Sequence, residues 1–306
     1  MPSTLVHWGV QGLASRALFR KADLKWVFLG LVLPDVPWIV QRVIRFLPFA
    51  PDPYSLKLYG LVQSSLAFCL LLAVALAALS VSFWRTSALL AFNAWAHLLM
   101  DALEQKGGNG VFLFAPMSWR MTDWNVLPAE GWFIILLTGF GLVYGLWSWR
   151  HQAVGPPGTI NPRGHLRLAV AAAGILSYVL LPLAFLHGPL EADAFSIRTL
   201  KDIPGRPSRA AAFDRALFLP GDGGRLRLFT GEILRVEGIP LDRKRLVTVS
   251  GVFLAPDRFR ADQWTAHTPG FRDTATGLGL AFGAALWLHA GVRGARRRRA
   301  PTPWKP

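Results

Sequence analysis

A histidine and an aspartate stand four residues apart inside one long apolar stretch of the sequence. The stretch covers residues 86–104 and contains His97 and Asp101. Residues four apart lie on the same face of an α-helix, so these two side chains should point in one direction. An aspartate at the centre of a membrane helix costs roughly 2.5–3.5 kcal/mol on insertion scales, which indicates that it has a partner or a task. The pair therefore predicts two ligands of a metal ion.

Two further residues add to this chemistry. His7 lies near the amino terminus, and Asp35 lies between two prolines in the apolar run 26–46. Two prolines that close together should kink or break the helix. Two imidazoles and two carboxylates form a ligand set that suits zinc, manganese or iron. With one coordination position left open, such an ion lowers the pKa of a bound water and polarises a phosphoryl or carbonyl oxygen. Arg120 lies in the loop 105–129, which would cover the site, and it could bind a phosphate or an anionic transition state.

Each of these residues also has a simpler explanation. His7 could be a cap or interface residue, and Asp35 could cap a half-helix, where a carboxylate is favoured. His97 and Asp101 could bond each other or a neighbouring helix. Arg120 could contact lipid headgroups or set the topology. Taken one residue at a time, the sequence leaves these alternatives open.

The elements that would position these residues are membrane helices. Hydrophobic residues make up 52% of the 306 residues, and the mean hydropathy is +0.34. The apolar residues come in blocks of about 18–22, the length that crosses a bilayer. We expect a mainly α polytopic membrane protein of about six to seven membrane helices. The expected segments are 3–19, 26–46, 60–82, 86–104, 130–149, 166–187 and 274–292. Residues 47–59, between the second and third segments, should form a Pro-rich loop.

The remaining part of the chain has a different pattern. Residues 225–229 and 246–250 alternate between apolar and polar types, and a turn signal at 220–224 precedes the first of them, which predicts a small antiparallel β domain. The pattern leaves open whether it is an OB-like barrel or a sandwich. We expect a helical membrane domain with the metal site at 1–187, the β domain at 188–272, and a final membrane helix with a basic tail at 273–306.

The charge distribution predicts an orientation in the membrane. The net charge is +15, but the basic residues lie between the apolar blocks and in an arginine-rich tail, which is a topology signal and gives no reason to expect a nucleic-acid partner. With that tail and the 150–167 linker in the cytoplasm, the amino terminus and the β domain lie outside. The single cysteine, Cys69, excludes a disulfide or a thiolate metal cage within the chain.

Three stretches together resemble a known family. Residues 5–35, the His-x-x-x-Asp motif at 97–101, and 110–120 with Pro116 and Arg120 resemble the bacterial membrane-bound metal-dependent hydrolase family, an inner-membrane, LexA-regulated type. The resemblance covers about residues 1–150. It implies a metal site whose ligands are His7, Asp35, His97 and Asp101.

The chain departs from the family pattern at two places. Val36 and Pro37 follow Asp35 where family members often carry a second acidic residue. Residues 61–66 contain no histidine, whereas the family often has one in that segment. These departures favour one ion over two.

The sequence thus predicts an inner-membrane, single-metal hydrolase, with zinc as the first choice and manganese or iron as alternatives. Its partners would be the lipid bilayer and a lipid-like ester or phosphoester substrate, with Asp101 and Arg120 in catalytic roles. The oligomeric state is left open. Two other functions also remain open: a proton- or cation-linked transporter, and a non-catalytic membrane protein that presents the β domain to a partner.

Overall fold

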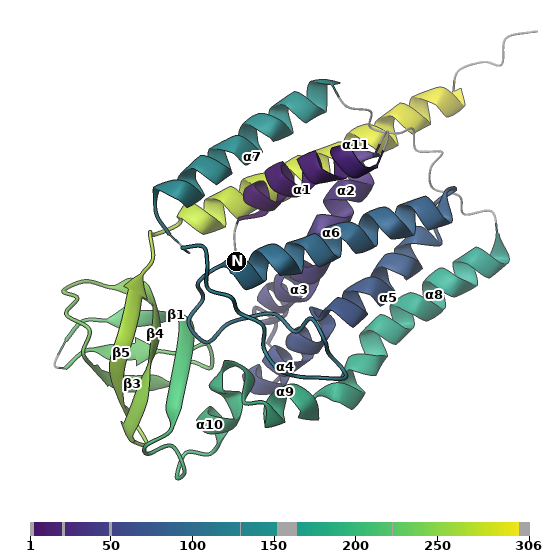
Figure 1. Ribbon diagram of the computed structural model, residues 1–306. Helices are drawn as coiled ribbons and strands as arrows, with labels where there is room; N and C mark the ends of the chain where they lie inside the picture. The colour runs from purple at the N-terminus through teal and green to yellow at the C-terminus, as the bar shows by residue number, and fades with distance from the viewer. Residues whose placement is uncertain are drawn as a thin grey trace, which may run out of the picture.

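A bundle of helices carries a small β-barrel at one end (Figure 1). The computed structural model describes residues 3–19, 22–48, 51–128, 130–151, 164–221 and 223–299, with side chains up to 292. The topology prediction uses the basic linker and the arginine-rich tail. Most of that linker and all of the arginine side chains of the tail lie outside the described residues.

Four described helical segments are long and apolar enough to cross a membrane. They are Leu24–Ile44, Trp132–His151, His165–Glu191 and Phe271–Val292. A fifth would be added if the bent pair Pro53–Gln63 and Leu66–Ala77 is one span. The expectation of a mainly helical chain with several candidate membrane helices is confirmed.

Two expected membrane segments are not among these candidates. Helix α1 (Thr4–Leu18) has only 15 residues, and helix α6 (Phe83–Leu103) carries several polar side chains along its length. Both helices nevertheless pack inside the bundle, where α1 contacts α2 (Leu24–Val32), α6, α7 (Trp132–His151) and α11 (Phe271–Arg299). The number of six to seven spans stays a prediction.

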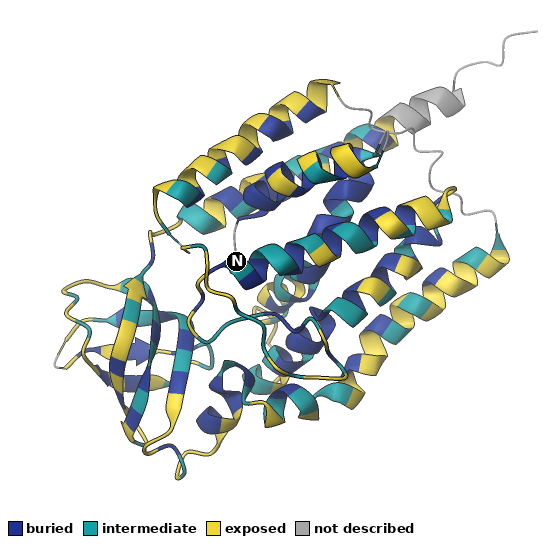
Figure 2. Cartoon of the chain, in the orientation of Figure 1, coloured by how far each residue is buried: buried dark blue, intermediate teal, exposed yellow. Residues whose placement is uncertain are grey.

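The outer helices expose apolar faces. Helix α8 (His165–Leu180) packs on α5 (Leu66–Ala77), and its other side is largely exposed (Figure 2). Large apolar side chains stand on the exposed faces of α7 and α8, among them Ile135, Val143, Leu146, Leu176 and Leu180. Faces of this kind are expected where a helix meets lipid.

Glycines allow α1 and α7 to approach closely. A Cβ atom added at Gly141 of α7 would lie 1.9 Å from the carbonyl oxygen of Leu5, and one added at Gly9 of α1 would lie 2.8 Å from the Gly141 Cα. Only glycine fits at such a crossing, as is common between membrane helices. This crossing fixes the position of α1 and therefore of His7.

The second expected span is broken at its prolines, as predicted. Helix α2 ends at Val32, a 3₁₀ turn η1 covers Leu33–Asp35, and helix α3 covers Val36–Ile44. Pro34 and Pro37 each lack a backbone N–H and disfavour a continuous helix. The break places Asp35 at the junction of the two half-helices.

The predicted loop at 47–59 is wrong in its second half. Helix α4 (Pro53–Gln63) begins there, because Asp52 accepts a hydrogen bond from the Ser55 N–H at 2.9 Å and Pro53 stands at the first helical position. Helix α4 is bent by 66° from α5, so the predicted span at 60–82 is divided between two helices.

Short helices precede the β-barrel. The 3₁₀ turn η3 covers Leu181–Phe185, α9 covers His187–Glu191, η4 covers Ala194–Ser196, and α10 covers Ile197–Lys201. The expected β domain at 188–272 therefore begins with helical turns, and its first strand starts only at Ala210.

The β domain is a closed barrel, which decides between the two expected folds. Its strands are β1 (Ala210–Leu219), β2 (Arg225–Arg227), β3 (Ile233–Glu237), β4 (Arg245–Ala255) and β5 (Arg258–Ala266). They follow the order β1-β2-β3-β5-β4 and close back on β1. All pairs are antiparallel except β3–β5, which is parallel, so the antiparallel prediction holds for four of the five pairs. Its core contains Phe213, Phe253 and Phe259, which pack against one another.

Hydrogen bonds join the barrel to the loops at the end of the bundle. Asn109 Nδ2 donates to Asp214 Oδ2 at 2.9 Å, and Thr248 Oγ1 donates to Asp214 Oδ1 at 2.7 Å. Thr248 Oγ1 also lies 2.7 Å from His267 Nε2, and His267 Nδ1 lies 2.9 Å from Glu130 Oε1. These hydrogen bonds hold the barrel against two segments of the helical domain: the segment that follows α6 and the segment that precedes α7.

Candidate metal centre

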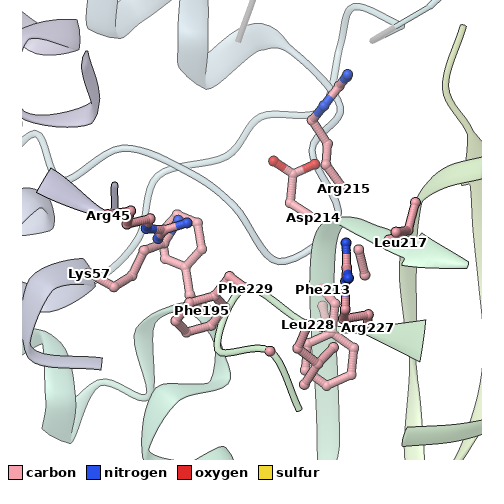
Figure 3. Close-up of a pocket in the computed structure, with 13 residues that line it drawn as sticks. Arg45, Lys57, Phe195, Phe213, Asp214, Arg215, Leu217, Arg227, Leu228 and Phe229 are labelled. Atoms are coloured by element: carbon pink, nitrogen blue, oxygen red, sulfur yellow. The ribbon is translucent and has the colours of Figure 1, made fainter. Parts of the chain in front are cut away.

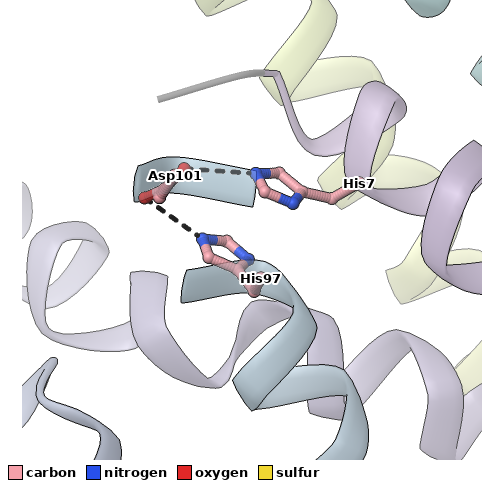
Figure 4. Close-up of side chains that lie close together, drawn as sticks. All are labelled: His7, His97 and Asp101. Atoms are coloured by element: carbon pink, nitrogen blue, oxygen red, sulfur yellow. Dashed lines mark ion pairs between the residues drawn. The ribbon is translucent and has the colours of Figure 1, made fainter. Parts of the chain in front are cut away.

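Three ionisable side chains meet between α1 and α6 (Figure 4). His7 Nε2 lies 3.5 Å from Asp101 Oδ1, and His97 Nε2 lies 3.7 Å from Asp101 Oδ2. The two imidazole rings are stacked in parallel, with 3.8 Å between their centroids. All three side chains are buried, and one ligand atom from each lies within 4.8 Å of the others. This group could hold a metal ion.

The other ring nitrogen of each histidine is already occupied. His97 Nδ1 donates to the carbonyl oxygen of Leu31 at 2.6 Å. His7 Nδ1 lies 2.9 Å from the Gln11 carboxamide, and the amide orientation that satisfies both of its ends turns the oxygen toward the ring. Each neutral imidazole therefore carries its proton on Nδ1 and directs the Nε2 lone pair toward Asp101. Histidines that bind metal ions in proteins are held in this way.

The atoms that face one another in this group lack hydrogen-bond partners among the described residues. They are Nε2 of His7, Nε2 of His97 and both carboxylate oxygens of Asp101. Lone pairs on neutral nitrogen and on carboxylate oxygen repel at these distances, so a cation or a shared proton is favoured between the two Nε2 atoms and the carboxylate. Two imidazoles and a carboxylate suit zinc and leave a coordination position open.

Asp35, the fourth predicted ligand, lies beside this group. Its Oδ1 is 3.7 Å from His97 Nε2, and its side chain is 17% exposed, whereas those of His7, His97 and Asp101 are 0% exposed. The four predicted ligands are thus neighbours in space, with three in one buried group and Asp35 at its solvent side. The role of Asp35 as a ligand stays a prediction.

A lysine that the sequence analysis did not single out joins the site. Lys106 Nζ lies 3.3 Å from Asp101 Oδ2 and 3.4 Å from Glu104 Oε2, and its side chain is buried. Burial alone would lower the pKa of Lys106, but the two carboxylates raise it above its usual range. The ammonium group therefore helps to keep Asp101 ionised. Only the turn of the chain after α6 brings Lys106 back to Asp101, so no local spacing could reveal the contact.

A cavity of about 560 Å³ opens on the solvent side of the group. Asp35 and Asp101 belong to its wall, together with parts of α3, α11, the loop after α6 and the barrel. Six cationic side chains line it: Arg42, Arg45, Lys57, Lys106, Arg215 and Arg272. Four carboxylates also line it, namely Asp35, Asp101, Asp214 and Asp273. The cavity therefore favours an anionic ligand next to the candidate metal site.

Arg120 is not part of this wall. Its side chain is exposed, and its backbone N–H donates to Ser118 Oγ at 3.3 Å. Within the loop 105–129, which we expected to cover the site, residues 106 and 109–112 line the cavity. The catalytic role of Arg120 stays a prediction, while other cations occupy the cavity wall.

Fold and site together define a helical chain with candidate membrane spans, a five-stranded barrel, and a buried histidine–aspartate group that could hold a metal ion. No family model, no curated protein and no solved structure matches the chain.

Proposed function

We propose that the chain is a membrane-embedded, metal-dependent hydrolase that acts on a lipid-like ester or phosphoester. One observation carries this proposal: the Nε2 atoms of His7 and His97 and the carboxylate of Asp101 converge without hydrogen-bond partners among the described residues. A buried set of this kind that faces a cavity is suited to a catalytic ion with an open position.

The protein's own groups would prepare the site. Gln11 and the Leu31 carbonyl hold the two imidazoles in one tautomer, and Lys106 keeps Asp101 charged. Asp35 lies where it can contribute a carboxylate from the solvent side. A bound divalent ion supplies Lewis-acid chemistry, in that it activates a water and polarises a phosphoryl or carbonyl oxygen. Zinc is the first choice for this ligand set, and manganese or iron are the alternatives.

The cavity wall supports an amphipathic substrate. Ile39 and Val43 of α3 and Leu280 of α11 line one part of it, while cationic side chains line another. An acyl or prenyl chain fits the apolar part, and an anionic headgroup fits the cationic part. We therefore infer that the substrate is lipid-borne.

The arrangement of charges supports an inner-membrane location with the barrel outside. Arg16 and Arg150 lie in the last turns of α1 and α7, and Arg85 and Arg167 lie near the starts of α6 and α8. These helix ends are on the side of the bundle away from the barrel (Figure 1). Under the positive-inside rule this side is cytoplasmic, so the cavity opens toward the extracytoplasmic side.

The test is metal content and turnover of the full chain purified in mild detergent. We expect about one divalent ion per chain, and His97→Ala and Asp101→Ala should each lose it together with hydrolysis of phospholipid or a chromogenic phosphodiester. His187→Ala is the matched control, because His187 is exposed and pairs with Glu191 away from the site. Unchanged metal content in both site variants would refute the metal centre.

One contact favours a second candidate function. Lys106 and Asp101 form a buried ion pair beside the cavity, and buried ionisable pairs within membrane domains can also serve proton or cation transport. A transporter would move substrate into proteoliposomes without covalent turnover. If the chain is instead a non-catalytic protein that presents the barrel to a partner, replacing the four predicted ligands should leave its function intact. Deleting the barrel should then abolish that function.

A further inference from the structure

A second cavity lies between the helices and the barrel (Figure 3) and shares part of its wall with the first. Its volume is about 450 Å³. Five residues line both cavities and therefore mark the place where they join: Arg45, Lys57, Phe195, Asp214 and Arg215. Arg45 and Lys57 come from the helical side, and Asp214 and Arg215 come from strand β1 of the barrel. We call this junction the barrel cleft.

A β-bulge in strand β1 brings Arg215 to the barrel cleft. The pairing of β1 with β4 shifts register between Phe213 and Ala216, and Arg215 has a φ of 55°. An arginine in this left-handed region is strained by about 1–3 kcal/mol, and such strain persists where the surrounding structure enforces it, often at functional sites. Bulges commonly redirect a side chain next to a binding site. Here the bulge makes Arg215 part of the wall of both cavities.

Neighbouring hydrogen bonds fix the bulge. The Arg215 N–H donates to Thr248 Oγ1 at 3.2 Å, and Thr248 Oγ1 donates to Asp214 at 2.7 Å. Asn109 donates to the other oxygen of Asp214. Burial would raise the pKa of Asp214, but the hydrogen bonds from Thr248 and Asn109 contribute to holding it below its usual range. Asp214 is thus a satisfied carboxylate that anchors the bulge.

The cations of the barrel cleft are not neutralised by ion pairs. Arg45, Lys57 and Arg215 have no carboxylate oxygen within 4.0 Å among the described residues, although other cations near the cavity do, such as Arg42 with Asp273 at 3.7 Å. Lys57 Nζ lies over aromatic rings instead, 4.1 Å from the centroid of Phe195. Arg45 and Lys57 lie together on the helical side of the barrel cleft, and Arg215 lies across from them beside Asp214, with its side chain directed away from the other two cations (Figure 3). Three such cations in the wall of one junction favour an anion, and phosphate matches guanidinium donors well.

We propose that the barrel cleft is a phosphate-binding subsite, in which Arg215 of the barrel and Arg45 and Lys57 of the helices bind a phosphate group of a lipid headgroup. In this proposal the barrel completes the headgroup pocket through Arg215, and the pocket thereby selects phosphate-bearing lipids. The claim that this lipid is the substrate rests on the proposed function. The claim that its phosphate binds in the barrel cleft is independent of the proposed function.

The test measures ligand binding by the full-length chain in detergent. The probes are dihexanoyl phosphatidic acid, dihexanoyl phosphatidylcholine and inorganic phosphate. We expect phosphatidic acid to bind best, and Arg215→Ala to weaken that binding by roughly ten- to a hundredfold, the loss typical of a charge-assisted hydrogen bond. Arg215→Lys should retain part of the affinity. Arg225→Ala is the matched control, because Arg225 is on the same barrel and lines neither cavity.

Metal content and thermal unfolding are measured on each variant to separate binding from folding. If Arg215→Ala unfolds, Arg45→Ala provides the same test from the helical wall, where Arg45 is an exposed residue at the end of α3. Equal binding by wild type and both variants would overturn the proposal, as would inorganic phosphate binding as tightly as the lipid. Arginine-dependent binding of phosphatidic acid by a chain without metal or turnover would support the subsite while refuting the hydrolase.

Discussion

The two histidines of the site are held by different kinds of acceptor. A backbone carbonyl in α2 orients His97, and a side-chain amide one turn along α1 orients His7. In both cases Nδ1 is engaged and Nε2 faces Asp101, so the pair is organised before any ion binds. Pre-organisation of this kind strengthens metal binding, because the ligands need not reorient.

Gln11→Leu tests this orientation. The change keeps the approximate size of the side chain but removes the acceptor for the His7 Nδ1–H. We expect metal affinity to fall about ten- to a hundredfold, as is typical when the partner of a metal-binding histidine is lost. Competition with a chromogenic chelator measures the affinity. Gln105→Leu, at an exposed position, should leave it unchanged, and equal affinity in Gln11→Leu would show that the amide does not orient the ring.

At the scale of the elements, the site depends on how closely α1 lies to its neighbours. Helix α1 is short and is held between α7 and α11. The contact with α7 passes through Gly9 and Gly141, where backbone meets backbone. Any displacement of α1 moves His7 away from the two ligands on α6.

Gly141→Ala tests the crossing. The added methyl group would lie 1.9 Å from the Leu5 carbonyl oxygen, a backbone atom that cannot turn aside. We expect a loss of stability of about 1–3 kcal/mol from overpacking, together with weaker metal binding. Gly139→Ala is the control on the same helix. Its added methyl group would have no neighbour within 4 Å among the described residues, so the change should be neutral or slightly stabilising. Thermal unfolding of both variants measures the difference in stability. Equal melting temperatures would contradict the close approach of α1 and α7 at Gly141.

At the scale of the whole molecule, the candidate metal centre ties together segments that are far apart in the chain. His7, Asp35 and the His97–Asp101 pair come from three separate helical elements, and the barrel closes the cavity beside them. An ion bound there would act as a cross-link that only the folded chain can form. Folding stability and metal binding are therefore coupled.

Removal of metal should accordingly lower the melting temperature. With free metal at a hundred times its dissociation constant, the expected stabilisation is about 2.7 kcal/mol. Differential scanning fluorimetry with and without a chelator measures the shift. The melting temperature of His97→Ala should not change when the chelator is added. A chelator effect of the same size in that variant would mean that the ion binds elsewhere.

Local geometry accounts for what the sequence by itself determined. The side chains of His97 and Asp101 share a helix face because they are four residues apart, and Pro34 and Pro37 break a helix because they lack a backbone N–H. The strands at 225–227 and 245–255 follow from two-residue alternation. These features depend only on near neighbours in the chain. They sufficed to predict the helical class, the proline break and a β domain.

Tertiary structure alone decided the rest. Lys106, Gln11 and the Leu31 carbonyl reach the site through packing between elements that are distant in sequence. Arg215 reaches the cavity because the pairing of β1 with β4 forces a bulge, and no local pattern encodes the register of two strands. Helices pack by the shape of their surfaces, so the sequence could propose four ligands but could not show which of them meet. The structure places three of them in one buried group, with Asp35 at its edge.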